Sequence, residues 1–258
     1  MRALFLLLAM LASPALACGP DTDCEIENGL YRVHLPPEAP QGAILFAHGY
    51  RGTAAGTIRN GALTRLADDL GVALVALKSF DEDWTIPNAP SAGQRPERDE
   101  VAYVRRVKDD VAERFGIDPE RMLMAGFSAG GMLTWNVACE AGDGFAAFVP
   151  MSGTFWKGPP DHCPTDARIY HFHGTADTVV PIEGRPIGPT VQGDMNAVLA
   201  MYRADKGLET RSAPAFQGLD CIRREGAAAM LQYCLHPGGH QFRADWIRGV
   251  WDEVFAGR

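Results

Sequence analysis

A short glycine-rich turn near the middle of the chain constrains the fold more than any other feature. Residues 126–131 read G-F-S-A-G-G and place Ser128 inside the pattern G-x-S-x-G. The apolar run 122–125 before the turn predicts a buried strand, and residues 132–140 after it predict a helix. A sharp strand-to-helix turn lifts one serine hydroxyl out of the sheet and places it at a helix N-terminus, which favours negative charge. Ser128 is therefore the candidate nucleophile.

A serine hydroxyl needs a general base, and the base needs a third group that orients it and stabilises its cation. Asp177 follows the strand-like run 169–172 and so lies past the carboxyl end of a strand, where open α/β sheets gather their ligand-binding groups. His240 follows two glycines, which leave its loop free to bring the imidazole back over the sheet. We predict Ser128, His240 and Asp177 as nucleophile, base and acid. Their order along the chain, serine then acid then histidine, is typical of enzymes that carry such a turn.

Other residues compete for the roles of base and acid. His236 is close to His240 in the sequence and is the runner-up for the base. Asp220 also falls between the serine and the histidine, but its position at the start of a predicted strand favours a turn residue. His171 and His173 lie within and at the end of the strand that leads to the acid, and we interpret them as packing or loop-fixing residues.

An early strand leads into a loop that can supply an oxyanion hole. The apolar run 43–47 predicts the strand, and the loop 48–52 follows it. One backbone N–H from this loop and one from the residue after the nucleophile would face the developing alkoxide. We assign these two donors to Tyr50 and Ala129.

Aromatic side chains occur in loops that follow strand ends, where a substrate pocket is expected. The candidates for substrate binding are Trp84, Phe155 and Trp156. The formal net charge of −8, together with an apolar pocket and the lack of a glycine-rich phosphate loop, favours a neutral ester over a phosphate. Three loops rich in proline and glycine are interpreted as active-site loops, namely 87–96, 158–164 and 184–193.

These motifs together carry a family resemblance. The chain resembles the esterase and depolymerase branch of the α/β-hydrolases, which includes polyhydroxybutyrate depolymerase-like proteins, feruloyl esterases and acetyl xylan esterases. The resemblance rests on the segments 48–50, 103–140, 173–181 and 238–240. It implies an α/β-hydrolase fold, a mostly parallel sheet with helices on both faces in a single domain, and it makes Ser128, Asp177 and His240 the triad.

The remaining hydrophobic pattern agrees with an α/β architecture. Residues 72–77 form a nearly continuous apolar run, as parallel strands covered on both faces do. Apolar residues recur at helical spacing over 101–115, and Trp246, Val250 and Val254 mark a closing helix. Alternating strands and helices predict a mostly parallel sheet. Because such folds reach ~200–250 residues as one unit, we expect residues 18–258 to form one catalytic domain.

The first residues predict a signal peptide, 1–17. Arg2 supplies a positive start, 3–11 an apolar core and 15–17 an A-x-A cleavage site. The apolar core is shorter than the ~20 residues that a membrane-spanning helix needs. We therefore expect a secreted or periplasmic protein with no stable membrane span. Cleavage would leave Cys18 first, so a lipoprotein acylated at Cys18 is the alternative.

Six cysteines follow the predicted signal peptide, and an even number in an exported chain suggests disulfides. One pair flanks a short polar loop, a second lies on two strands of a predicted hairpin, and the third follows by elimination. Fifteen pairings are possible for six cysteines, and free thiols are a further alternative. The pairing proposed here is Cys18–Cys24, Cys139–Cys163 and Cys221–Cys234. No cysteine or histidine spacing resembles a metal site, and we expect no metal or other cofactor.

The sequence thus predicts a serine carboxylic-ester hydrolase that forms an acyl-enzyme. The expected substrates are small-molecule or oligomeric esters with short-chain, aryl or hydroxyalkanoate groups. A polyhydroxybutyrate depolymerase that acts on polymer and a serine peptidase of the same fold are the alternatives. The acidic balance argues against nucleic acid as a partner. The sequence does not define an oligomeric state.

Overall fold

The structure is a computed structural model that describes residues 18–90, 93 and 97–256, so the predicted signal peptide lies outside the described residues. Within them, eleven strands form one sheet in the order β1-β2-β4-β3-β5-β6-β7-β13-β12-β10, with β11 paired to β12. These strands are β1 (Cys24–Ile26), β2 (Gly29–His34), β3 (Ala43–Ala47), β4 (Ala73–Leu77), β5 (Met122–Phe127), β6 (Ala147–Met151), β7 (Arg168–Gly174), β10 (Thr210–Ser212), β11 (Ala215–Phe216), β12 (Leu219–Glu225) and β13 (Met230–His236).

The middle of the sheet is parallel. Strands β4, β3, β5, β6, β7 and β13 run parallel to one another. The strands at the two edges pair antiparallel with their neighbours. Strands β3, β4 and β6 are buried along their whole length, because a parallel strand in this class is covered on both faces. The predicted α/β class with a mostly parallel sheet is confirmed.

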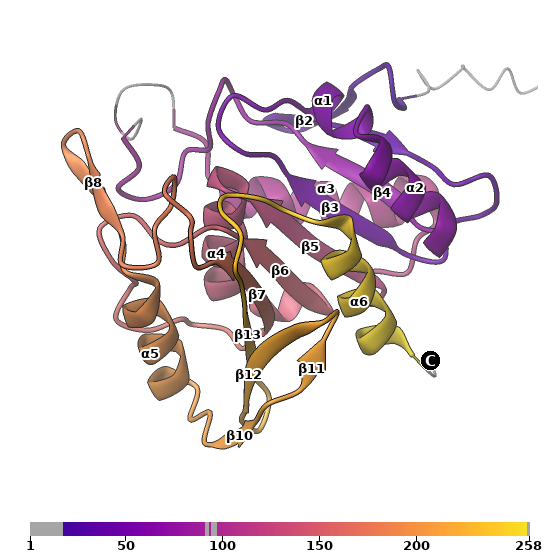
Figure 1. Cartoon of the computed structure of the whole chain (residues 1–258). Coiled ribbons are helices and arrows are strands. Elements are labelled where there is room, and N and C mark those ends of the chain that lie inside the picture. The colour runs from indigo at the N-terminus through magenta and orange to yellow at the C-terminus, as the bar shows by residue number, and fades with distance from the viewer. Residues whose placement is uncertain (1–17, 91–92, 94–96, 257–258) are drawn as a thin grey trace, which may run out of the picture.

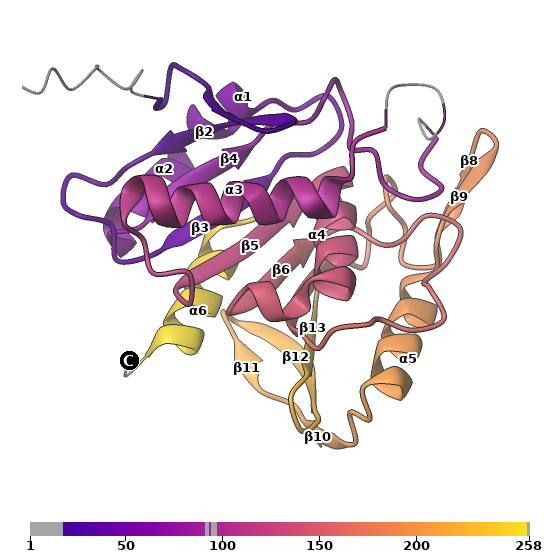
Figure 2. The same ribbon diagram turned by 180° about the vertical axis from the view of Figure 1, so that it is seen from behind.

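Helices cover both faces of the sheet, as Figures 1 and 2 show. The helices α3 (Glu100–Phe115), α4 (Ala129–Glu140) and α5 (Met195–Asp205) pack into one hydrophobic core. The helices α1 (Ala54–Ile58), α2 (Gly61–Leu70) and α6 (Ala244–Phe255) pack into the core on the opposite face. The sheet therefore separates two cores, and the loops at its ends are free to form a site.

The long helix α3 shows how the sequence defines an element locally. Asp99 caps its N-terminus, because the side chain accepts the backbone N–H of Ala102 at 2.9 Å. Gly116 ends it in the left-handed conformation, with φ of 65°, which glycine adopts without strain. Val104 and Val107 lie on the buried face between these ends, as their helical spacing predicts.

Three disulfides link the described chain: Cys18–Cys24, Cys139–Cys163 and Cys221–Cys234. This is the pairing proposed from the sequence. The third bond joins two strands at directly opposite positions, because Cys221 of β12 pairs in register with Cys234 of β13.

A two-stranded ribbon, β8 (Arg185–Ile187) and β9 (Thr190–Gln192), lies within the segment that the sequence analysis treats as a loop. The ribbon projects beyond the sheet in Figures 1 and 2. Its neighbour is the loop after β6, because Trp156 forms a bridge with Gln192 and the N–H of Lys157 donates to the carbonyl oxygen of Val191 at 2.6 Å.

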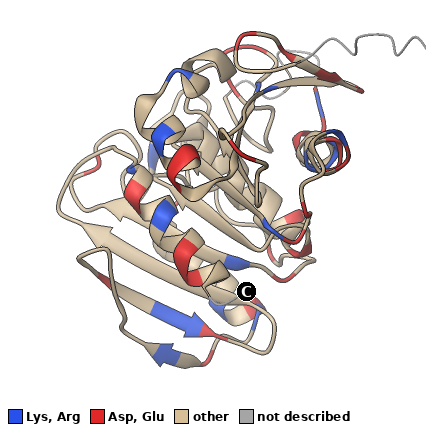
Figure 3. Cartoon of the chain, turned by 90° about the vertical axis from the view of Figure 1, so that its right-hand side faces the viewer, with Lys and Arg blue, Asp and Glu red and all other residues tan. Residues whose placement is uncertain are grey.

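Charged residues lie on the outer surfaces of the helices and on the β10–β12 edge, whereas the middle strands carry almost none (Figure 3). Among the described residues, no helix combines the length and the apolar character needed to cross a membrane.

Candidate active site

The turn between β5 and α4 holds Ser128 in a strained conformation. Its φ is 58° and its ψ is −120°, a region that non-glycine residues rarely occupy. Only glycine fits two positions before and two positions after Ser128, at Gly126 and Gly130. A Cβ on Gly126 would lie 2.2 Å from the carbonyl oxygen of Gly130, and one on Gly130 would lie 2.0 Å from that of Ala47. The Ser128 side chain makes no capping bond to α4, so its hydroxyl remains available for chemistry.

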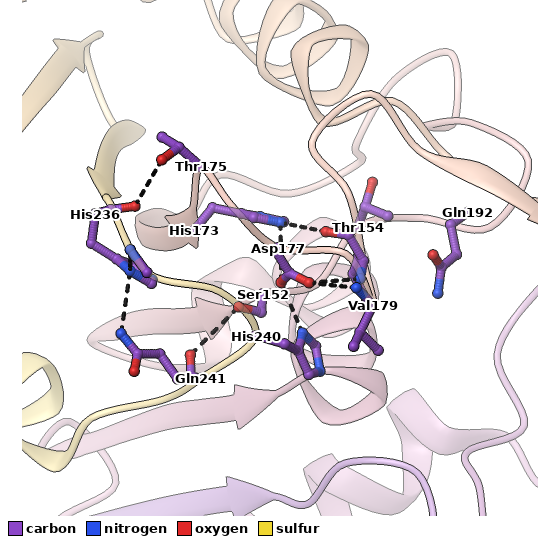
Figure 4. Close-up of polar contacts among 12 residues, drawn as sticks. Ser152, Thr154, His173, Thr175, Asp177, Val179, Gln192, His236, His240 and Gln241 are labelled. Atoms are coloured by element: carbon purple, nitrogen blue, oxygen red, sulfur yellow. Dashed lines mark hydrogen bonds and ion pairs between the residues drawn. The ribbon is translucent and has the colours of Figure 1, made fainter.

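Asp177 lies in the loop after β7, and its side chain is fully buried. One carboxylate oxygen, Oδ1, accepts the backbone N–H groups of Val179 and Val180, each at 2.9 Å. The other, Oδ2, lies 2.8 Å from Nδ1 of His240. Burial acts to raise the pKa of Asp177, but the hydrogen bonds from His240 and the two backbone groups outweigh it and lower the pKa. The carboxylate is therefore ionised. Figure 4 shows it in contact with the imidazole of His240.

The bond to Asp177 determines how His240 presents its ring. A carboxylate can only accept, so Nδ1 carries the proton and Nε2 is left as the acceptor that a general base needs. The ring lies 4.6 Å, between centroids, from that of Phe127, the residue before the candidate nucleophile. Ser128 and His240, both described residues, make no hydrogen bond to each other. Bonds of this kind are often long in a free enzyme and tighten when substrate binds.

The loop that carries His240 is joined closely to the loop that carries the acid. The N–H of Thr175 donates to the carbonyl oxygen of His236 at 2.9 Å, and that of Ala176 donates to Gly238 at 3.1 Å. Gly174 makes this approach possible, because a Cβ there would lie 2.3 Å from the carbonyl oxygen of Gly238. The two loops therefore hold base and acid as one unit.

A chain of hydrogen bonds in the interior supports the acid loop. Trp135 donates from Nε1 to Nδ1 of His171 at 3.1 Å, so the proton of His171 is on Nε2. That nitrogen lies 2.9 Å from Nδ1 of His173. His173 in turn donates from Nε2 to the carbonyl oxygen of Val180 at 2.7 Å, and the N–H of Val180 donates to Asp177. Burial lowers the pKa of both histidines, and well below its ordinary value for His171.

The two residues predicted to supply the oxyanion hole lie in the loop after β3 and at the start of α4. Ala129 begins α4, and the first N–H groups of a helix have no intrahelical acceptor. Within the described residues, the N–H of Tyr50 donates to no other group. Gly49 brings its loop against the nucleophile, because a Cβ there would lie 3.3 Å from Cβ of Ser128. Tyr50 and Ala129 both line the same cavity as Ser128.

A cavity of about 440 Å³ opens beside Ser128. Its apolar wall includes Met132, Trp156 and Ile187. The full lining, apart from these and Ser128, is Tyr50, Asp83, Pro90, Ala129, Val179, Val180, Arg185 and Gln192. Tyr50, Ala129 and Trp156 are therefore brought to the site.

Two predicted substrate contacts need correction. Trp84 is fully buried, and its Nε1 donates to the carbonyl oxygen of His48 at 2.8 Å, so it supports the loop 48–52. Phe155 is also buried and packs on Trp135, with ring centroids 6.0 Å apart. Neither lines the cavity. An aromatic residue after a strand can face the core as readily as the site, and the sequence does not distinguish these cases.

The runner-up residues lie outside the catalytic contacts. His236 is buried, and its Nδ1 accepts the N–H of Gly238 at 3.1 Å, so it shapes the loop that carries His240. Asp220 lies within β12, opposite Ala215, and is not a turn residue. The loop 158–164 does not line the cavity and instead holds Cys163 in its disulfide.

Arg185, Ile187 and Gln192 line the cavity, and they lie in the segment 184–193 that the sequence analysis interprets as an active-site loop, although none of the three is predicted individually. They belong to the β8–β9 ribbon, whose strands are three residues each and carry proline and glycine around them. Only two residues of β8, Arg185 and Ile187, share the face toward the cavity, and a pattern of two residues is too short to predict which face of a strand is buried.

Comparisons with known proteins agree with this architecture. The chain is 32% identical over 240 residues to NocK of Nocardia uniformis subsp. tsuyamanensis, a protein that carries an esterase name. The matched region covers 81% of this chain and 69% of NocK. It is 33% identical over 100 residues to feruloyl esterase B of Piromyces equi, or 37% of this chain and 18% of that protein. An acetyl xylan esterase from Aspergillus awamori has the same fold, with a TM-score of 0.59 and 14% identity over 86% of this chain and 94% of that one. No protein-family model matches the chain.

The chain belongs to the esterase family of the α/β-hydrolases. It is a carboxylic-ester hydrolase with the fold of that class.

Proposed function

We propose that the chain is an exported serine esterase in which Ser128, His240 and Asp177 form the catalytic triad. Nε2 of His240 takes the proton of the Ser128 hydroxyl as Oγ attacks the ester carbonyl carbon. Asp177 holds the imidazole and stabilises its cation. The N–H groups of Tyr50 and Ala129 donate to the negative oxygen of the tetrahedral intermediate.

Collapse of the first intermediate releases the alcohol, which receives its proton from His240, and leaves an acyl group on Ser128. Water then attacks the acyl-enzyme with His240 again as base. A second tetrahedral intermediate collapses to release the acid and restore the serine hydroxyl. Both halves use the same two N–H donors, because the negative charge develops on the same carbonyl oxygen.

One observation carries this proposal: the hydrogen bond of 2.8 Å between His240 and a fully buried, ionised Asp177 beside the cavity that contains Ser128. An imidazole held in this tautomer presents an acceptor nitrogen. A serine in a strained turn presents a hydroxyl. This arrangement is the working unit of serine acyl transfer.

The proposed substrates are short-chain, aryl or hydroxyalkanoate-oligomer esters. A cavity of about 440 Å³ with an apolar wall can hold an acyl or aryl group of that size. A depolymerase that acts on solid polyhydroxybutyrate is the second candidate, because exposed apolar side chains, Tyr50 and Val179, lie at the cavity and could contact a polymer surface. A serine peptidase would use the same triad, and a panel of substrates separates it.

Export is proposed from the three disulfides, which persist in oxidising compartments. A secreted or periplasmic location follows if residues 1–17 are removed as a signal peptide. Residues 18–258 would then form the single catalytic domain.

Labelling with a fluorophosphonate probe tests the nucleophile. The probe should attach to Ser128, and the Ser128→Ala protein should neither bind it nor hydrolyse esters. Ser212→Ala, at an exposed serine of β10, is the matched control and should be labelled normally. An adduct found by mass spectrometry on any other serine would contradict the assignment. Acyl, feruloyl, hydroxybutyrate-oligomer and peptide substrates then rank the candidate activities.

A further inference from the structure

We propose that the active site recognises esters that carry a carboxylate, and that Arg185 is the residue that binds it. This inference rests on the proposed function and defines the substrate class more narrowly. The starting observation is an arginine of the β8–β9 ribbon in the wall of an otherwise largely apolar cavity that Ser128 also lines. The guanidinium of an arginine stays charged in proteins.

The register of the ribbon explains why Arg185 faces inward. Arg185 of β8 lies opposite Gln192 of β9, and both line the cavity. Ile187 lies two residues along the same strand and therefore on the same face, and it also lines the cavity. The intervening partners, Pro186 and Val191, are exposed on the other face.

Hydrogen bonds fix the ribbon at both ends, so the face that lines the cavity is held in place. Thr190 donates from Oγ1 to the carbonyl oxygen of Asn88 at 2.8 Å. At the other end, the N–H of Gly193 donates to the carbonyl oxygen of Phe155 at 2.8 Å. Figure 4 shows Gln192 on the side of the acid loop that carries Val179. A side chain presented from this face keeps its position when substrate enters.

Arg185 has one polar partner among the described residues, and that partner is neutral. Its Nε donates to Oε1 of the buried Gln192 at 3.1 Å. This bond orients the guanidinium, and no carboxylate of the described chain forms an ion pair with it. A guanidinium with a single neutral partner has N–H donors left for a bound molecule.

Asp83 is the other charged residue of the cavity, but its carboxylate already accepts the backbone N–H of Trp84 at 2.9 Å. The guanidinium of Arg185 keeps N–H donors beyond the one bonded to Gln192, and these can donate to a substrate. A carboxylate suits it, because the guanidinium fork can donate two parallel bonds to the two oxygens. Monoesters of dicarboxylic acids carry the carboxylate on the acyl side, and esters of hydroxy acids, including a linear oligomer with one free acid end, carry it on the alcohol side.

Matched pairs of substrates test the proposal. On the acyl side, monoethyl adipate is compared with ethyl hexanoate, and on the alcohol side 4-acetoxybutanoate with butyl acetate. Within each pair the carboxylate replaces a methyl group. We expect kcat/KM to favour the carboxylate in at least one pair by about 10-fold or more, and Arg185→Gln to reduce that ratio about 10- to 100-fold, the range for a charged hydrogen bond. Arg185→Lys should retain part of the preference, because lysine keeps the charge without the fork.

Arg211→Gln is the control variant, because it removes the same charge from an exposed strand, β10, away from the cavity. It should leave the ratio unchanged. The proposal is overturned if neither pair favours the carboxylate, or if Arg185→Gln and Arg211→Gln have equal effects. Preference for an ester that bears an ammonium group would also overturn it.

A binding experiment separates this proposal from the proposed function. Calorimetry with Ser128→Ala, which cannot turn over, should detect monoethyl adipate and show at least tenfold weaker binding when Arg185→Gln is added. Specific binding without turnover in the wild-type chain would support carboxylate recognition while contradicting the esterase triad. Equal affinity for monoethyl adipate and ethyl hexanoate in Ser128→Ala would contradict the recognition of a carboxylate even in an active esterase.

Discussion

Nε2 of His171 and Nδ1 of His173 are 2.9 Å apart in a part of the core where neither side chain is exposed. Because Trp135 donates to the first histidine and the second donates to the carbonyl of Val180, the proton on each ring is fixed by its neighbours. Nε2 of His173 also lies 3.7 Å from Oδ2 of Asp177. A second proton on either ring would have to oppose another N–H, so the pair is built for the neutral form.

The first prediction concerns the pH dependence of stability. Burial lowers the folded-state pKa of His171 and His173. Below about pH 6.5, the ordinary value, the unfolded chain binds protons that the folded chain does not, so the free energy of unfolding falls as the pH falls. Above that value the contribution is complete. Each histidine adds a slope of at most about 1.4 kcal/mol per pH unit. Urea unfolding at pH 7.5, 6.0 and 5.0 measures it.

The His173→Gln protein should be less stable at pH 7.5, because the bond to Val180 is weakened. Between pH 6.5 and 5, however, its free energy of unfolding should depend less steeply on pH, because unfolding takes up as much as one proton fewer. His162→Gln replaces an exposed histidine and is the control, whose slope should match that of the wild type. A wild-type slope of zero in this range would mean that the buried pair does not differ in protonation between the two states.

The second prediction concerns the triad. Ser128→Ala and His240→Ala should each lower kcat for a good ester by ~10⁴-fold or more, because nucleophile and base act as a unit. Asp177→Asn should lower kcat somewhat less than either of these changes. Circular dichroism checks that each variant is folded. If His240→Ala kept near-normal activity, the base would lie elsewhere, and His236 would be tested next.

The third prediction concerns the disulfide between Cys221 and Cys234. Replacing both cysteines by alanine should lower the free energy of unfolding by about 3 kcal/mol, because the bond closes a loop with a sequence separation of 13. Since β13 leads directly into the loop of His240, kcat should also fall at temperatures where the fold persists. The same change at Cys18 and Cys24, separation 6, should have the smaller effect on stability and none on kcat. Equal kcat for both double variants would make the Cys221–Cys234 bond purely structural.

The parts of this fold that could be predicted are those recorded in local sequence. The turn around Ser128 depends on glycines within a few positions of the serine. The hairpin that pairs Cys221 with Cys234 is likewise short in sequence. Contacts between distant segments left no such signal. Trp84 is held by His48, and Arg185 by the register of a ribbon of two three-residue strands, so their orientation depended on the complete fold.

The histidines next to the acid illustrate the same limit. Their position at a strand end correctly suggested a loop-fixing role for His173, which bonds to Val180. The partner of His171, however, is Trp135 on α4, and no local pattern connects a helix residue to a strand residue 36 positions away.

The last prediction concerns two tryptophans, Trp84 and Trp156, that were both predicted from the sequence to bind substrate. Trp156 lines the cavity, so Trp156→Ala should raise KM for aryl and long-acyl esters more than for acetate esters, because only the larger groups reach that wall. Trp84 is buried behind His48, so Trp84→Ala should instead lower the free energy of unfolding by about 3–5 kcal/mol and reduce kcat for every ester alike. Its lost support would let the oxyanion loop move, and that loop serves all substrates equally. Steady-state kinetics on an acetate and an aryl ester, with urea unfolding of both variants, measures the contrast. If Trp156→Ala changed KM equally for the two ester classes, Trp156 would lie outside the acyl and aryl site; a size-dependent effect of Trp84→Ala would mean that the indole moves into the cavity when substrate binds.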